Sequence, residues 1–353
     1  MNTSDVTVRP AVPADAADVV AALRRAEGVS HFDTWMYDAS LVAQAWQDGT
    51  IRSWVAVDEH GVVRAHAALI LDEVGRPRQQ IKASQPVLEY GLAFTDPVFR
   101  GQGLAVAIGQ RALAWAQQHH VGEVYSWTTT LRPFAQRALR EAGAMEICLL
   151  LAMMPPGVNR GYRHDIAEAA AAMLFVLRLG PLGRSQTWYL PDEYRPLTAR
   201  LTAGLGITIT SLTGQEPPAP RASTVLSATA GPADDDLSWH YFEPLRFGVI
   251  DVAAGRSPVA AIVRRTFALA QAGADVTYVD LPPDEPCIVH LMPALAHHGF
   301  TFAGVHPHYR TGALRLRMQA VTCRLQPRDS ITTASGLGRD LLDLTWRGLP
   351  DAP

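Results

Sequence analysis

The sequence predicts an α/β protein, of the α+β kind, built from two units that each combine a sheet with flanking helices. Its 353 residues are more than one hydrophobic core usually holds. Segments of alternating apolar residues, typical of strands, take turns with segments whose apolar residues recur at helical spacing. The order of these elements recurs, and "GQGLAVAI" at 101–108 is matched by "GRSPVAAI" at 255–262. At the same offset Glu89 falls on Glu243, so we expect a duplication.

The composition is typical of a soluble globular chain, with 48% hydrophobic residues, 18% charged residues and a formal net charge of −3. This charge gives no reason to expect a nucleic-acid or anionic-membrane partner. The cysteines, Cys148, Cys287 and Cys323, are widely spaced and form no CxxC pair. We therefore expect neither a disulfide framework nor a zinc site, and a reducing cytoplasm fits best. No stretch is typical of a signal peptide or of a membrane span.

The periodicity of the first half predicts an alternation of strands and helices. Strands are expected at 6–11, in a hairpin at 52–71, and at 87–95, 123–130 and 145–154, and helices at 13–28, 39–47, 104–118 and 132–144. The polar stretch 74–85 is expected to be a loop. The segment "AAAAMLFVLRL" at 169–179 suits a closing strand, although its alanines also suit a helix.

The second half is predicted to repeat this order. A strand and a Pro-initiated helix are expected within 187–207, then a loop at 214–235, a single strand at 238–252, a helix at 258–274, a strand at 275–282, a helix at 287–299 and paired strands at 300–307 and 313–321. Residues 323–353 are interpreted as a tail with one amphipathic stretch, "LGRDLLDLTWRGL".

The stretch "FRGQGLA", residues 99–105, follows a predicted strand and opens a predicted helix. The first N–H groups of a helix lack intrahelical partners and the helix dipole is positive there, so this arrangement favours an anion such as a phosphate. Glycines allow a close approach of the backbone, and Arg100 adds positive charge. An ordinary Gly-rich turn is the alternative. A Walker loop is excluded because no Lys-Ser/Thr pair follows, and Val106 breaks a dinucleotide fingerprint.

In its context, "AFTDPVFRGQGLA" resembles the pyrophosphate loop of the GNAT acyltransferase superfamily, R/Q-x-x-G-x-G/A. The resemblance implies two tandem GNAT-like domains, each with a mixed, mostly antiparallel twisted sheet, and acetyl-CoA or another acyl-CoA as co-substrate without a metal. It implies an N-terminal domain at 1–182 whose loop amides hold the CoA pyrophosphate, while the backbone beside them pairs with the pantetheine arm as an added strand would. The implied binding residues are Ala93, Phe94, Thr95, Arg100, Gly101, Gln102, Gly103, Leu104 and Ala105.

In many members of this family a Glu eight residues before the turn proline acts as general base, and here that residue is Glu89. A Glu that pairs with an arginine or ends in solvent is the alternative interpretation. The usual general acid of the family is a Tyr, but Leu139 occupies the corresponding position and has no hydroxyl to protonate the leaving thiolate. Tyr125 and Cys148 are candidates from neighbouring strands, and both also suit a core.

The second unit, 183–322, resembles a degenerate GNAT repeat. Its residues Ala254, Ser257 and Pro258 stand where the first unit has Arg100, Gly103 and Leu104, and proline has no N–H to donate. We therefore expect this unit to be structural or acceptor-binding and to hold no second CoA, although Glu243 is retained. The histidine doublets at 119–120 and 297–298 and the "HPH" at 306–308 are candidate metal ligands, but doublets at helix C-termini suit the helix dipole.

Together these features predict an acyl-CoA-dependent N-acyltransferase, most simply an N-acetyltransferase, that acts on an amine of a small molecule or peptide. A non-catalytic acyl-CoA-binding module and an acyltransferase that takes its donor from an acyl carrier protein are the alternatives. The acceptor is expected near residues 27–40 and 74–88, which carry no recognisable motif. Either a monomer or a homodimer is compatible with the sequence.

Overall fold

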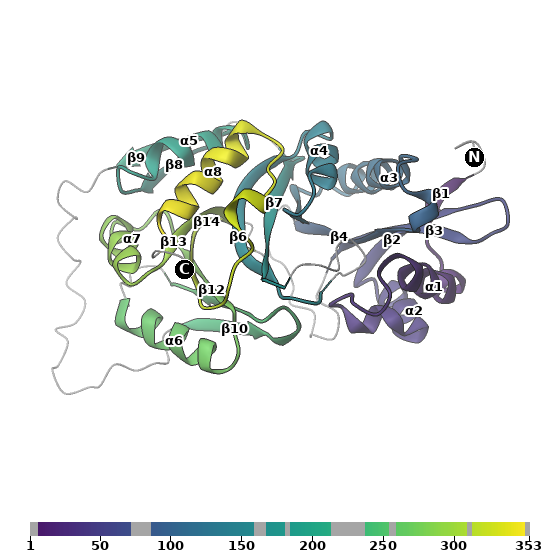
Figure 1. The fold of residues 1–353 in the computed structure, drawn as a ribbon. Coiled ribbons are helices and arrows are strands. Elements are labelled where there is room, and N and C mark those ends of the chain that lie inside the picture. The colour runs from purple at the N-terminus through teal and green to yellow at the C-terminus, as the bar shows by residue number, and fades with distance from the viewer. Residues whose placement is uncertain are drawn as a thin grey trace.

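The computed structural model describes residues 6–71, 86–158, 167–180, 184–212, 237–253, 259–308 and 313–349. Its main element is one twelve-stranded sheet in the order β1-β2-β3-β4-β5-β7-β6-β13-β14-β12-β11-β10 (Figure 1). The sheet is mixed and mostly antiparallel, and helices flank it, as the sequence predicts. None of the helices among these residues is long and apolar enough to cross a membrane.

The first seven strands form one half of the sheet. They are β1 (Thr7–Pro10), β2 (Ile51–Val57), β3 (Val63–Ile70), β4 (Val87–Thr95), β5 (Glu123–Thr129), β6 (Met145–Met154) and β7 (Ala170–Arg178). Neighbouring strands in this half are antiparallel except for β4 and β5, which run parallel. The segment 169–179, which the sequence left open between strand and helix, is the strand β7.

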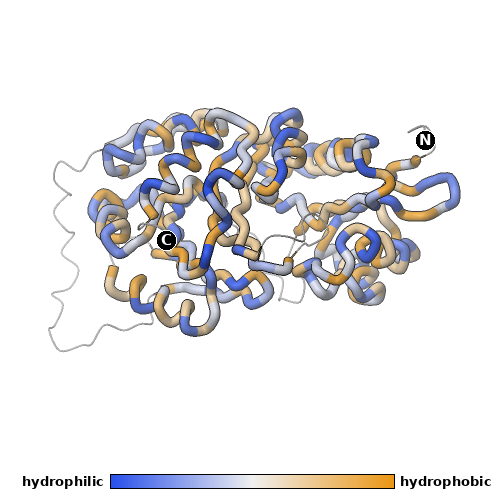
Figure 2. The backbone as a smooth tube through the Cα atoms, in the orientation of Figure 1, coloured by the Kyte–Doolittle hydropathy of each residue, from blue (hydrophilic) through white to orange (hydrophobic). Residues whose placement is uncertain are grey.

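Helices cover both faces of this half because successive strand residues point to opposite faces. Val55 and Val57 of β2 pack in one apolar cluster with α1 (Ala16–Glu27) and α2 (Ala39–Gln47). Trp54 and Ala56 pack in another with α3 (Leu104–Gln118). The hydropathy colouring in Figure 2 shows hydrophilic and hydrophobic residues alternating around these helices. The helix α4 (Phe134–Glu141) contacts β5 and β7.

The second half continues the same sheet with β10 (Ser238–Phe242), β11 (Phe247–Asp251), β12 (Val276–Leu281), β13 (Thr301–Pro307) and β14 (Leu314–Val321). From its outer edge inwards, this half runs antiparallel, parallel and then twice antiparallel. Strands β3 to β7 show the same succession of directions. Helices α6 (Val259–Gln271) and α7 (Ile288–His297) follow β11 and β12 as α3 and α4 follow β4 and β5.

A separate pair of parallel strands, β8 (Arg184–Tyr189) and β9 (Ile207–Leu212), is connected by α5 (Arg195–Ala203). This strand followed by a Pro-containing helix is the arrangement that the sequence predicts.

The two halves meet where β6 pairs with β13 at Gly304 and Cys148. Gly304 has a φ of 129°, and a Cβ atom there would lie 2.2 Å from the carbonyl oxygen of Ile147. Only glycine allows so close an approach. The buried Gln319 side chain of β14 adds to the joint, because it accepts from the Leu151 amide at 2.9 Å and donates to the Leu149 carbonyl at 3.0 Å.

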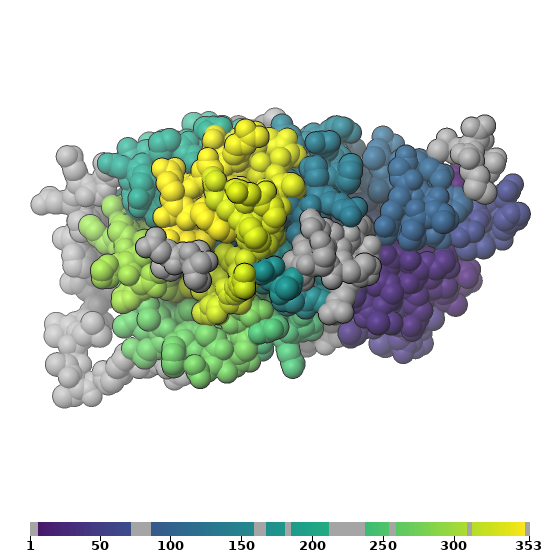
Figure 3. Space-filling view, viewed as in Figure 1, coloured from purple at the N-terminus to yellow at the C-terminus, as the bar shows by residue number. Residues whose placement is uncertain are grey.

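The C-terminal segment packs into the molecule at this joint. Its helix α8 (Gly336–Arg347) contacts β6 and β13, and its residues Leu341 and Leu342 are buried. The space-filling view shows this yellow segment lying against the teal and green parts of the chain (Figure 3). The amphipathic stretch of the expected tail falls largely in this helix, and its residues Leu341 and Leu342 belong to the main hydrophobic core.

One predicted element is wrong. The segment 238–252 is not one strand but the two antiparallel strands β10 and β11, joined by a 3-10 turn at Glu243–Leu245. Arg246 ends this turn with a φ of 50°, a left-handed conformation that reverses the chain. Glu243 is therefore exposed in a turn and not on a strand beside a cleft, which corrects its expected equivalence with Glu89. The predicted loops at 74–85 and 214–235 and the segment 254–258 lie outside the described residues.

Candidate active site

The parallel strands β4 and β5 pair over only three residues, Val87 to Glu89 with Glu123 to Tyr125. Both strands continue beyond this point without pairing to each other, to Thr95 and Thr129. The pairing of β4 with β3 is irregular in the same stretch, where Leu92 has a φ of 52°. Such a bulge bends a strand away from its neighbour. The two strands therefore open a slot between them directly after Glu89.

The N-terminus of α3 lies at the end of β4, after a 3-10 turn at Pro97–Phe99. Gly101 and Gly103 have φ values of 76° and 77°. A residue with a side chain would be strained in this backbone conformation. The first helical hydrogen bond runs from Ala107 to Gly103, so the amides of 104–106 precede the intrahelical ladder. Apart from the adjoining residues of the chain, no heavy atom lies within 4 Å of a Cβ built on either glycine, so there is open space beside this turn.

Arg100 lies between the strand and this helix. Its guanidinium donates to the carbonyl oxygens of Thr95 at 3.3 Å and Ala26 at 3.2 Å, and its side chain remains exposed. These two hydrogen bonds connect the end of β4 with the end of α1. Its positive charge lies beside the first turn of α3, where an anion would also benefit from the helix dipole.

The structure brings most of the predicted binding residues together around one cavity of about 1860 Å³. The predicted residues that line it are Glu89, Ala93, Thr95, Arg100, Gly101, Gly103, Leu104 and Ala105. Two predicted residues do not line the cavity. The buried Phe94 ring packs on His66 at 5.2 Å in the core beneath α1, and Gln102 donates to the Val98 carbonyl at 3.4 Å.

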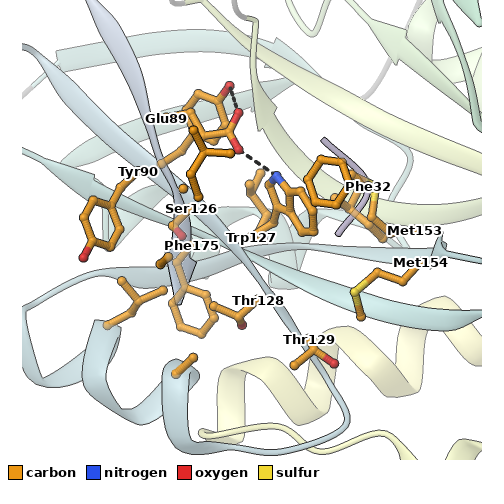
Figure 4. Close-up of a pocket in the computed structure, with 18 of the residues that line it drawn as sticks. Phe32, Glu89, Tyr90, Ser126, Trp127, Thr128, Thr129, Met153, Met154 and Phe175 are labelled. Atoms are coloured by element: carbon orange, nitrogen blue, oxygen red, sulfur yellow. Dashed lines mark hydrogen bonds between the residues drawn. The ribbon is translucent and has the colours of Figure 1, made fainter. Parts of the chain in front are cut away.

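Glu89 is held by two donors from the neighbouring strand. The Tyr125 hydroxyl donates to its Oε2 at 3.1 Å, and the Trp127 indole N–H donates to its Oε1 at 2.9 Å (Figure 4). Tyr125 and Trp127 are two residues apart on β5, so both side chains lie on the same face as Glu89. Gly91, on that face of β4, leaves room for the carboxylate, because a Cβ there would lie 3.2 Å from Oε1.

Leu139 of α4, which stands at the expected position of the general acid, lines the cavity. Tyr125 also lines the cavity, but its hydroxyl hydrogen bonds to Glu89. Cys148 is fully buried in the core at the joint between the halves, and burial raises the pKa of its thiol to about 12. Cys148 is therefore not placed to donate a proton into the slot.

Three polar residues that line the cavity were not predicted from the sequence. Glu27 is the last residue of α1, and His31 and Asp33 follow this helix. Burial raises the pKa of Glu27 to about 7 against the opposing charge of Arg100, and raises that of Asp33 to about 6. Burial lowers the pKa of His31 to about 4, so this ring is neutral at pH 7. No motif marks these residues, although the region 27–40 is where the acceptor was expected.

The cavity extends to the second half of the sheet, where β12, β13 and β14 contribute its far wall. Arg317 donates to both carboxylate oxygens of Asp280 at 2.7 Å, and Tyr278 donates to the Leu151 carbonyl at 2.7 Å. His306 also lines this wall, and burial lowers its pKa to about 3. The polar groups of this wall therefore include a neutral imidazole and an ion pair without net charge.

Among the described residues of the second half, β11 and β12 do not part as β4 and β5 do. All five residues of β11 pair with β12, from Phe247 with Val276 to Asp251 with Asp280. The ladder continues beyond the strand, where the Val252 amide donates to the Asp280 carbonyl at 2.9 Å. Backbone groups that pair with each other cannot also pair with an inserted arm.

The histidine doublets lie at the ends of α3 and α7, as predicted from the sequence. His119 stacks on Trp115 at 4.0 Å and hydrogen bonds its carbonyl. In the part of the chain that the structure describes, no group of three or more His, Cys, Asp or Glu side chains could hold a metal ion.

The part of the chain that forms this slot also matches a known family. Residues 17–144 match the sequence model of the Acetyltransferase (GNAT) family. Residues 17–144 therefore form a GNAT acetyltransferase domain. This match contains α1 to α4 and the strands β2 to β5, and hence both sides of the slot.

Solved structures similar to the chain include a GNAT superfamily phosphinothricin acetyltransferase from Sinorhizobium meliloti in complex with AcCoA. That likeness has 18% identity, covers 50% of this chain and 89% of that one, and has a TM-score of 0.40. An N-acetyltransferase from Staphylococcus aureus Mu50 is 15% identical over 50% of this chain and 99% of its own, with a TM-score of 0.39. No curated protein sequence matches the chain.

The exposed Ala105 in the first turn of α3 offers a direct test of the anion site. Ala105→Asp adds a negative charge where helices tolerate one, so the free energy of unfolding should stay within about 1 kcal/mol of the wild type. CoA affinity, measured by calorimetry, should fall at least about tenfold because the carboxylate repels a pyrophosphate. Ala114→Asp, at an exposed position on the same helix, is the matched control. Equal CoA affinity in both variants would contradict the site.

Glu27 should make the folded chain less stable as pH rises. Its carboxyl has a pKa of about 7 when folded against 4.5 as the ordinary value, so the unfolded chain releases a proton that the folded chain keeps. The free energy of unfolding therefore decreases between about pH 4.5 and 7, by a total on the order of 3 kcal/mol. Glu27→Gln should remove this loss and stabilise the chain at pH 8 but not at pH 4, as urea unfolding at both pH values would reveal. A variant that is less stable than wild type at pH 8 would disprove the assignment.

Proposed function

We propose that the chain is an acyl-CoA-dependent N-acyltransferase, with acetyl-CoA as the simplest donor and a primary amine as acceptor. The observation that carries this proposal is the parting of β4 and β5 after Glu89, with the free amides of α3 at the far end. A phosphorylated donor with a long amide-containing arm could fill both the slot between β4 and β5 and the anion site at the start of α3. The arm would add to the slot as a strand, and the pyrophosphate would accept from the loop 100–105.

The residues of this chain have separate roles in the reaction. The amine nitrogen bonds to the thioester carbonyl carbon, the carbon–sulfur bond breaks, and one proton leaves the amine for Glu89. The donors Tyr125 and Trp127 fix the carboxylate, and Glu89 is the residue that we assign as the general base. Leu92 and Ala93 have no partner in the β3 ladder, so their amides are candidates to stabilise the negative charge on the thioester oxygen. With Leu139 at the acid position, the thiolate takes its proton from solvent.

The proposal assigns different roles to the two units. Residues 1–182 form the domain with the acyl-CoA site, and residues 183–322 form a degenerate repeat that supports the sheet and contributes to the far wall of the cavity. The continuous ladder between β11 and β12 and the exposed position of Glu243 support a single donor site in each chain. Free cysteines at 148, 287 and 323 suit work in a reducing cytoplasm.

Glu89→Gln tests the chemistry. The variant keeps the shape of the side chain and loses the base, so kcat for acetyl transfer to an amine should fall by roughly 10²-fold or more at neutral pH, with CoA affinity retained. Release of free thiol from acetyl-CoA, measured across a panel of amines, is the readout. Glu243→Gln, in the exposed turn, is the control and should keep wild-type turnover.

Three results would contradict parts of the proposal. Wild-type turnover in Glu89→Gln would remove Glu89 from the mechanism. Tight CoA binding without thiol release for any amine would favour a binding module, in agreement with the missing tyrosine. Negligible affinity for free CoA together with transfer from an acylated carrier protein would favour that donor.

A further inference from the structure

The cavity end formed by the turn after α1 carries more carboxylates than the reaction uses. Glu27 and Asp33 line the cavity in addition to Glu89. Glu27 is only 5% exposed, and its Oε2 has no hydrogen-bond partner among the described residues. A buried carboxylate oxygen without a partner is costly, and a ligand that donates a hydrogen bond to it would offset this cost.

The cations near these two carboxyl groups have other partners among the described residues. Arg100 is the cation that acts on Glu27, and its guanidinium donates to two backbone carbonyls. Tyr37 also lies near Glu27 and is neutral at pH 7, and the Arg24 guanidinium lies over the Tyr37 ring, 5.1 Å from its centre. The neutral His31 accepts from the Asp33 amide at Nδ1, so its remaining ring nitrogen carries the hydrogen. The site as a whole therefore favours a positively charged ligand.

Aromatic rings complete this end of the cavity. Phe32 stacks on His31 at 4.9 Å and packs on Trp127 at 5.5 Å, and Trp35 lines the same region. Figure 4 shows Phe32 and Trp127 side by side next to Glu89. The faces of such rings attract cations and also accept alkyl chains. The lining thus suits an aliphatic chain that carries positive charge.

We propose that Glu27 and Asp33 form a subsite for a second ammonium group of the acceptor, which is then an aliphatic diamine or longer oligoamine. This inference rests on the proposed function, because Glu89 serves the amine that is acylated. Both sets of carboxyl groups line the same cavity, which the rings of Phe32 and Trp127 also line. A monoamine of equal chain length fills only one of the two subsites.

Binding can be measured apart from turnover. The full chain, saturated with CoA, is titrated by calorimetry at pH 7.5 with unbranched diamines of three to eight carbons and with the monoamine of each length. The best diamine should bind at least about tenfold more tightly than its monoamine, the scale of one hydrogen-bonded charge pair. In Glu27→Gln/Asp33→Asn this ratio should fall toward one.

Asp18→Asn is the matched control, because it removes a carboxylate from an exposed position on the same helix α1. It should leave the diamine-to-monoamine ratio unchanged. If the double variant fails to fold, each single variant is measured in its place, and each should lower the ratio. CoA affinity reports that the fold is retained.

The outcomes separate this inference from the function on which it rests. Diamine preference that disappears in the double variant supports the subsite even if no acetyl transfer occurs, and the lack of transfer then contradicts only the enzymatic function. Acetyl transfer to amines with equal affinity for diamines and monoamines contradicts only the subsite. An unchanged ratio in the double variant, or tighter binding of a lysine-containing peptide than of any diamine, would also overturn it.

Discussion

The parting of β4 from β5 is the constraint on which the rest of the site depends. Parallel strands normally satisfy each other's backbone groups along their whole length. Here the pairing stops at Glu89, and the bulge at Leu92 directs the rest of β4 away. The exposed backbone groups can then pair with a ligand, and the end of β4 delivers the chain to the glycine turn before α3. The β11–β12 pair shows the same strand directions without the opening.

The carboxylates around this opening are held in different ways. Glu89 receives two hydrogen bonds from β5, which fix the position of its carboxylate. Glu27 is buried, and its Oε2 has no hydrogen-bond partner among the described residues. Burial disfavours the charged form of this carboxyl group and so raises its pKa. A buried group that lowers the stability of the folded state is often found at a functional site. The joint at Gly304 and Gln319 lies in a different apolar cluster, which contains strands of both halves.

Local features of the fold were predictable from the sequence, and non-local ones were not. The glycines of "FRGQGLA" predict the start of α3 because their positive φ values depend only on neighbouring residues. The turn at Glu243–Leu245 was missed because Arg246, a residue that seldom adopts a positive φ, ends it. The donors to Glu89 depend on the register between β4 and β5, and Gly304 on the contact between β6 and β13. The residues of a single strand do not indicate which strand it pairs with or in what register.

A crystal structure of the full chain with CoA tests the central claim most directly. The account predicts one CoA in each chain, with its pantetheine arm between β4 and β5, its pyrophosphate at the amides of the 100–105 loop and its sulfur beside Glu89. The strands β11 and β12 should remain paired in that structure. A CoA arm between β11 and β12, or a CoA bound elsewhere while β4 and β5 close on each other, would contradict the account.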